Sequence, residues 1–158
     1  MTYSQKHPEA DYQIVGHASF ETILENLAAF KGERLLLPAA FKSLKLGIAW
    51  GDVHYLYLRQ MTLIDSFVMP LNPLLLVENT MVKNDLAYTH AATGALLLQY
   101  LPQAKLKTAP SKYLAYQEYK QNGQYVLTNE KNVTLQPYER ILAKIEVPMV
   151  WCLYQIRD

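Results

Sequence analysis

One arginine stands apart in the most apolar part of the chain. Residues 46–77 carry three formal charges, and Arg59 is the one cation among them. It belongs to residues 53–61, whose alternating pattern is typical of a strand. Read with a period of two, Arg59 lies on the same face as Tyr55 and Tyr57. A guanidinium on an aromatic face is costly to bury unless an anion meets it, so Arg59 is the first candidate for chemistry.

The anion that meets Arg59 is either a ligand or an acid of the protein itself. A ligand carboxylate or phosphate would accept paired hydrogen bonds from the guanidinium, in a pocket walled by Tyr55 and Tyr57. The internal candidates are Glu78 and Glu146, and an arginine near a strand end can also keep its charge in water. Glu146 follows an apolar run and is either an outward-facing residue or part of the ligand site.

The composition narrows the class of protein. The chain has 158 residues, of which 51% are hydrophobic, so it can bury the core of one ordinary domain. Fifteen basic and fourteen acidic residues give a net charge of +1, without the basic surplus of nucleic-acid-binding proteins. The charge-free apolar run at residues 66–77 is too short to span a bilayer, and residues 1–11 lack a signal-peptide core. We expect a cytoplasmic protein that does not bind a membrane, and its charge gives no strong signal for nucleic-acid binding.

Motifs for metal, nucleotide or covalent chemistry are missing from the sequence. The four histidines have no metal-ligand spacing, and the single cysteine excludes both an intramolecular disulfide and a cysteine-rich metal site. No glycine-rich loop precedes a helical pattern, and no nucleophile elbow is present. We therefore expect no metal and no cofactor.

The remaining pattern predicts an α+β fold, built on a mostly antiparallel sheet of about six strands with two or three helices. The clearest helix follows Ser19, a good N-cap residue, and ends before Gly32. A second helix is expected at residues 90–101. The strands are expected at residues 34–37, 53–63, 74–82, 141–147 and 149–156, with residues 65–73 as a loop. We expect residues 1–10 to form a flexible tail and residues 11–158 to form a single domain.

An asparagine–glycine pair predicts a hairpin in the second half of the chain. Asn122 and Gly123 tolerate the positive φ angles of a tight type I′ turn, so residues 112–120 and 124–128 are expected to be its strands. The hairpin would carry four of the twelve tyrosines, namely Tyr113, Tyr116, Tyr119 and Tyr125. Because the register divides them between two faces, cross-strand packing is favoured over a stacking platform for a flat ligand.

Part of the sequence resembles a known family of ligand-binding domains. The stretch Leu-Gly-Ile-Ala-Trp-Gly at residues 46–51, then Arg59, Asp65 and the run at residues 73–78, is similar to the chorismate lyase-like superfamily, which includes the UTRA effector domains. The resemblance implies an antiparallel α+β fold with a pocket for an anionic metabolite. For a lyase, it implies that Arg59 grips a carboxylate and that Glu146 serves in proton transfer.

Three functions follow from these observations. The leading hypothesis is a domain that binds an anionic small molecule through Arg59, Tyr55, Tyr57 and Glu146. The first alternative is a lyase that acts on chorismate or a related enol ether. The second is a protein-interaction or oligomerisation module, with residues 67–71 as an exposed apolar surface.

Overall fold

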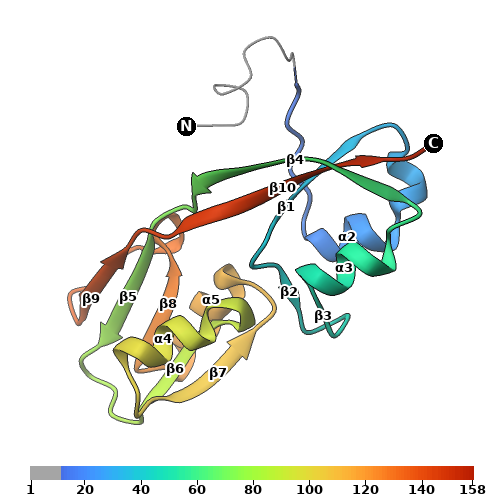
Figure 1. Ribbon diagram of the computed structural model, residues 1–158. Coiled ribbons are helices and arrows are strands. Elements are labelled where there is room, and N and C mark those ends of the chain that lie inside the picture. Colours follow the sequence, from blue (N-terminus) through green and yellow to red (C-terminus); the bar gives the residue numbers. More distant parts are fainter. Residues whose placement is uncertain (1–11) are drawn as a thin grey trace. The chain divides into compact units, whose positions relative to one another are not determined.

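The computed structural model describes residues 12–158, and these residues fold into two compact units (Figure 1). Unit 1 comprises residues 12–41, 46–69 and 148–158, and unit 2 comprises residues 42–45 and 70–147. The elements confirm an α+β fold with an antiparallel sheet. The single domain expected over residues 11–158 stays a prediction. The predicted tail, residues 1–10, lies outside the described residues.

Unit 1 contains a three-stranded sheet whose central strand comes from the end of the sequence. The strand order is β1 (Arg34–Pro38), β10 (Pro148–Ile156) and β4 (Met61–Pro70). The antiparallel pairing of β1 with β10 places Leu35 opposite Tyr154 and Leu37 opposite Cys152. All four side chains are buried, which is expected when facing residues in a pair point to the same side of the sheet.

Two helices cover the buried side of this sheet (Figure 1). Helix α2 (Phe20–Glu25) continues into the 3-10 turn η1 (Leu27–Phe30), and α3 is Trp50–Leu56. The hydroxyl of Ser19 accepts the amide hydrogen of Thr22 at 3.2 Å, which confirms the predicted N-cap. Gly32 follows with a φ of +78°, a conformation that glycine adopts readily. Two further strands are short: β2 (Lys42–Ser43) belongs to unit 2 and β3 (Ile48–Ala49) belongs to unit 1.

Unit 2 is built on a five-stranded mixed sheet. Its strand order is β7 (Lys105–Ala109), β6 (Leu86–His90), β8 (Tyr125–Asn129), β5 (Leu74–Asn79) and β9 (Glu139–Ile145). Strand β6 runs parallel to β7 and β8, while β5 runs antiparallel to β8 and β9. The 3-10 turn η2 (Ala91–Thr93) and helix α4 (Gly94–Tyr100) connect β6 to β7. Helix α5 (Lys112–Asn122) connects β7 to β8, and the turn η3 (Glu130–Asn132) follows β8.

The apolar run of β5 explains how this sheet is covered. Leu74 and Leu76 pack in one cluster with Leu97 of α4, and Leu75 and Val77 pack in another cluster with α5. Because successive side chains of a strand point to opposite faces, α4 and α5 cover opposite faces of the sheet. A strand that is buried on both faces reads as a continuous hydrophobic run, which is why this part of the sequence predicted a strand.

The predicted strand at residues 53–63 is wrong, because most of it forms helix α3 and the turn that follows. The carboxylate of Asp52 accepts the amide hydrogen of Ala49 at 2.8 Å and so stabilises the first turn of the helix. Val53 then lies in the core while the next tyrosine and leucine are exposed, as a one-sided helix requires. The predicted loop at residues 65–73 is also mostly strand, since β4 extends to Pro70.

The predicted hairpin at residues 112–128 is wrong as well. Its first half is helix α5, which begins after Ser111, whose hydroxyl accepts the amide hydrogen of Leu114 at 3.1 Å. The residues after this N-cap include lysine, glutamine, glutamate and alanine, which favour helices. Only the second half, β8, is a strand. The helix predicted at residues 90–101 is confirmed as η2 and α4. Within residues 12–158, no helix is both long and apolar enough to cross a membrane.

Candidate functional site

Arg59 does not lie on the strand face that the sequence predicts for it. Arg59 is exposed in the turn between α3 and β4, and Tyr55 is 78% exposed on α3. Tyr57 ends α3 and packs partly against the core of unit 1. Glu146 is exposed and follows β9 in unit 2. The prediction that Arg59, Tyr55 and Tyr57 share a strand face is therefore wrong, because a helix and a turn replace the strand.

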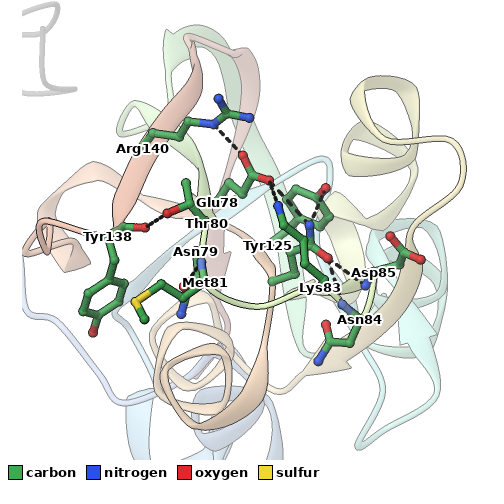
Figure 2. A network of polar contacts seen from close by, with 11 residues as sticks. Glu78, Asn79, Thr80, Met81, Lys83, Asn84, Asp85, Tyr125, Tyr138 and Arg140 are labelled. Carbon is green, nitrogen blue, oxygen red and sulfur yellow. Dashed lines mark hydrogen bonds and ion pairs between the residues drawn. The ribbon is translucent and has the colours of Figure 1, made fainter.

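The buried acid Glu78 pairs with Arg140 and not with Arg59. Glu78 is 3% exposed near the end of β5, and Arg140 is directly opposite on β9. The arginine Nε donates to one carboxylate oxygen (Figure 2). The ammonium of Lys83 lies 3.8 Å from the other carboxylate oxygen. The side chain of Gln124 donates to the same oxygen at 3.5 Å and to the hydroxyl of Tyr125 at 2.9 Å.

Gln124 also connects the Glu78 carboxylate, through hydrogen bonds, to the residues just before β6. Its side-chain oxygen accepts the amide hydrogens of Asn84 at 3.0 Å and Asp85 at 2.9 Å. Asp85 has a φ of +60°, so the two amides are held in a tight turn before the strand. The polar groups of this network satisfy one another, and we interpret it as a fastening of the strand ends and not as a ligand site.

Replacing Arg140 by methionine should destabilise unit 2. The substitution keeps the length of the side chain but leaves the buried carboxylate of Glu78 without its closest donor. Because the side chain of Arg140 is 65% exposed and solvent screens the pair, we expect a loss of about 1–2 kcal/mol in the free energy of unfolding, measured by urea denaturation. The control is Lys144→Met on the same strand, whose ion pair with Glu130 is exposed on both sides. Equal effects of the two substitutions would contradict a structural role of the buried pair.

The best candidate for a functional site lies at the carboxyl ends of the parallel strands of unit 2. The chain leaves β6, forms β7 on one side of it, and then returns through α5 to form β8 on its other side. In open α/β sheets, ligands bind outside the carboxyl ends of the strands where the strand order reverses in this way. In unit 2 that position is the edge formed by the ends of β6, β7 and β8, which we call the carboxyl edge.

Hydroxyl and amide side chains gather at the carboxyl edge. Thr89 is fully buried at the end of β6, where its hydroxyl donates to the carbonyl of Leu127 at 2.9 Å and lies 2.7 Å from the hydroxyl of Thr93. Thr128, also fully buried, donates to the carbonyl of Lys112 at 2.8 Å and accepts from the amide of Asn132 at 3.1 Å. These bonds hold the three strand ends and their following turns in fixed positions.

The carboxyl edge also carries an ammonium group in an unfavourable position. Lys112 is the first residue of α5, where the helix dipole disfavours a positive charge. The side chain is partly buried, and this burial lowers the pKa of Lys112. Within residues 12–158, no acidic side chain forms an ion pair with it. An anion bound at this edge would offset both the unfavourable helix dipole and the burial of the Lys112 ammonium.

The sequence carries a recurring pattern at the carboxyl edge that the predicted strands did not reveal. Thr89–His90, Ser111–Lys112 and Thr128–Asn129 each stand where a strand ends and a helical turn begins. A hairpin at residues 112–128 contains neither helix α5 nor the parallel crossover to β8. The predicted hairpin therefore does not bring these three positions together. No cluster of three or more His, Cys, Asp or Glu side chains within residues 12–158 could hold a metal ion.

Comparison with known proteins supports the fold. No protein-family model and no curated protein matches this sequence. A prephenate dehydratase from Arthrobacter aurescens, solved in complex with L-Phe, superposes over 98% of this chain and 55% of its own, with a TM-score of 0.57 and 14% identity. The prephenate dehydratase from Staphylococcus aureus superposes over 98% of this chain and 61% of its own, with a TM-score of 0.54 and 11% identity.

A periplasmic domain has a similar fold. The periplasmic VFT2 domain of Bordetella pertussis BvgS superposes over 96% of this chain and 66% of its own, with a TM-score of 0.51 and 16% identity. The chain therefore spans between about half and two thirds of these structures. At such identities the likeness concerns the fold alone. The chain has the fold of these three structures, over nearly its whole described length.

Proposed function

We propose that this protein binds a small anionic metabolite at the carboxyl edge of unit 2. The observation that carries the proposal is the reversal of strand order at β6, where the buried hydroxyl of Thr128 donates to the backbone carbonyl of Lys112, the first residue of α5. Similar folds belong to a prephenate dehydratase solved with L-Phe, which supports a small molecule as the ligand. Lys112 supports a negative charge on it, because the ammonium is partly desolvated and has no acidic partner within residues 12–158.

A thermal-shift screen with small carboxylates tests this proposal. The panel contains L-phenylalanine, prephenate, chorismate and inorganic phosphate, and a ligand of the native state raises the melting temperature. For the compound that binds, calorimetry on Lys112→Met should show affinity weakened by about tenfold or more, since a charge-assisted contact is lost. The control, Lys107→Met, removes an exposed lysine of β7 and should bind as the wild type does. Equal affinity in all three proteins, or no shift with any compound, would count against the proposal.

The assignment to the chorismate lyase-like type stays a prediction. It places the ligand on Arg59, Tyr55, Tyr57 and Glu146, so Arg59→Ala should abolish the thermal shift while Lys112→Met should not. Lyase activity would release pyruvate from chorismate above the rate of a blank. Self-association through residues 67–71 and a cytoplasmic location are likewise predictions, and light scattering on the Met69→Asp variant checks the first of them.

A further inference from the structure

The dipeptide Asn122–Gly123 joins helix α5 to strand β8 and carries a chemical liability. It is the one asparagine–glycine pair in the sequence. In a flexible peptide, the glycine nitrogen attacks the amide carbon of the asparagine with little hindrance, because glycine has no Cβ and moves freely. The new N–C bond closes a succinimide ring as the bond from that carbon to the amide nitrogen Nδ2 breaks. The glycine amide proton leaves with the released ammonia. One water molecule then opens the ring to aspartate or isoaspartate.

The native structure holds the attacking nitrogen away from this reaction. Asn122 is the last residue of α5, and the amide hydrogen of Gly123 donates to the carbonyl of Tyr119 at 2.8 Å. Ring closure needs a backbone ψ angle at the asparagine that lies outside the helical region. The nitrogen can therefore attack only after the last helical turn has opened.

The side chain under attack is held as well. The hydroxyl of Tyr88 donates to the side-chain oxygen of Asn122 at 2.7 Å. The side-chain amide of Asn84 donates to the backbone carbonyl of Asn122, also at 2.7 Å. Asn122 is exposed, so water reaches the residue once the turn opens. These two bonds hold the side chain and the carbonyl of Asn122 in the native conformation, from which the helix end has to open before the ring can form.

Packing explains why a reactive dipeptide stands at this position. Gly123 has a φ of −78°, so its backbone does not require glycine. A Cβ there would lie 2.8 Å from the ring of Tyr88 and 2.9 Å from the Cα of Tyr119. The two tyrosines that pack against position 123 thus require glycine there. As a result, Asn122 is followed by a glycine and is prone to deamidation. We infer that Asn122 is a deamidation site protected by the last turn of α5, so that its deamidation records the opening of that turn.

Peptide mapping by mass spectrometry tests the inference on the full-length protein. The protein is incubated in mildly alkaline buffer with and without denaturing urea, and deamidation of Asn122 is followed over time. We expect the folded protein to deamidate at least about tenfold more slowly than the unfolded one, as local opening limits the reaction. Equal rates in the two states would overturn the inference.

Two matched tyrosine variants separate local protection from general stability. Tyr88→Phe removes the hydroxyl that holds Asn122 and should raise the folded-state rate about threefold to tenfold. Tyr116→Phe removes a hydroxyl bonded to Thr134 in the same cluster and should leave that rate near the wild-type value. Circular dichroism confirms that each variant is folded. Equal acceleration in both, or in neither, would show that the Tyr88 hydroxyl does not protect the site.

Discussion

Gly123→Ala should be among the most destabilising single substitutions in unit 2. The added Cβ would meet the ring of Tyr88 at 2.8 Å and both the Cα and the ring of Tyr119 at 2.9 Å. A ring could shift, but the Cα belongs to the backbone of α5 and moves only with the helix. Overpacking of this kind costs about 1–3 kcal/mol, and we expect the upper end of that range in urea denaturation.

Gly51→Ala is the matched control for this prediction. Gly51 lies inside helix α3 of unit 1, its φ is negative, and a Cβ there would meet no atom within 4 Å. Alanine favours a helix by about 0.5–1 kcal/mol over glycine, so this variant should equal or exceed the wild type in stability. A similar loss in both variants would show that the tight contact at Gly123 does not decide the outcome.

Alkaline pH should weaken the fold through Tyr119. Burial raises the pKa of Tyr119, and the hydrogen bond to Glu139 and the charge of that carboxylate raise the pKa further. The unfolded polypeptide loses this proton near pH 10 while the folded protein keeps it. The folded state then binds more protons, so stability is present below about pH 10 and falls above it by about 1.4 kcal/mol per pH unit from this residue.

Tyr119→Phe should lower the stability at neutral pH and lessen the loss of stability at alkaline pH. At pH 7 the variant loses the 2.9 Å hydrogen bond to Glu139, which costs about 1–3 kcal/mol because the acceptor is charged. Above pH 10 the variant should lose stability less steeply, so the two stability curves converge. Urea denaturation at a series of pH values measures this. Tyr113→Phe, an exposed tyrosine of the same helix, should stay within about 0.5 kcal/mol of the wild type at pH 7. Parallel curves for the wild type and Tyr119→Phe would contradict the prediction.

The parts of the fold that follow local rules could be predicted from the sequence. Ser19 and the apolar stripe after it specify α2, and the buried run of β5 reads as a strand. The errors arose where one local rule outweighed another. At residues 53–61 the alternation of aromatic and aliphatic residues outweighed the cap formed by Asp52. At Asn122 the turn signal of the dipeptide outweighed the helix that Ser111 begins.

The candidate site could not be predicted for a different reason. Thr89, Lys112 and Thr128 are far apart in the sequence and meet because β6, β7 and β8 are parallel and reverse their order. Strand order depends on tertiary packing, which a single sequence does not reveal. Arg59 was singled out by its isolation among apolar residues, and isolation in sequence says nothing about which residues lie nearby in space.

The order of strands in unit 1 has a consequence for how the protein is made. Its central strand, β10, follows all five strands of the large sheet of unit 2 in the sequence, while its partners β1 and β4 precede them. During synthesis, the sheet of unit 2 is complete while the sheet of unit 1 still lacks its middle strand. Because domains generally fold as their residues emerge, unit 2 is expected to fold first and unit 1 only after β10 has been synthesised. Removal of β10 would therefore take from β1 and β4 the strand that lies between them, while sparing the five-stranded sheet of unit 2.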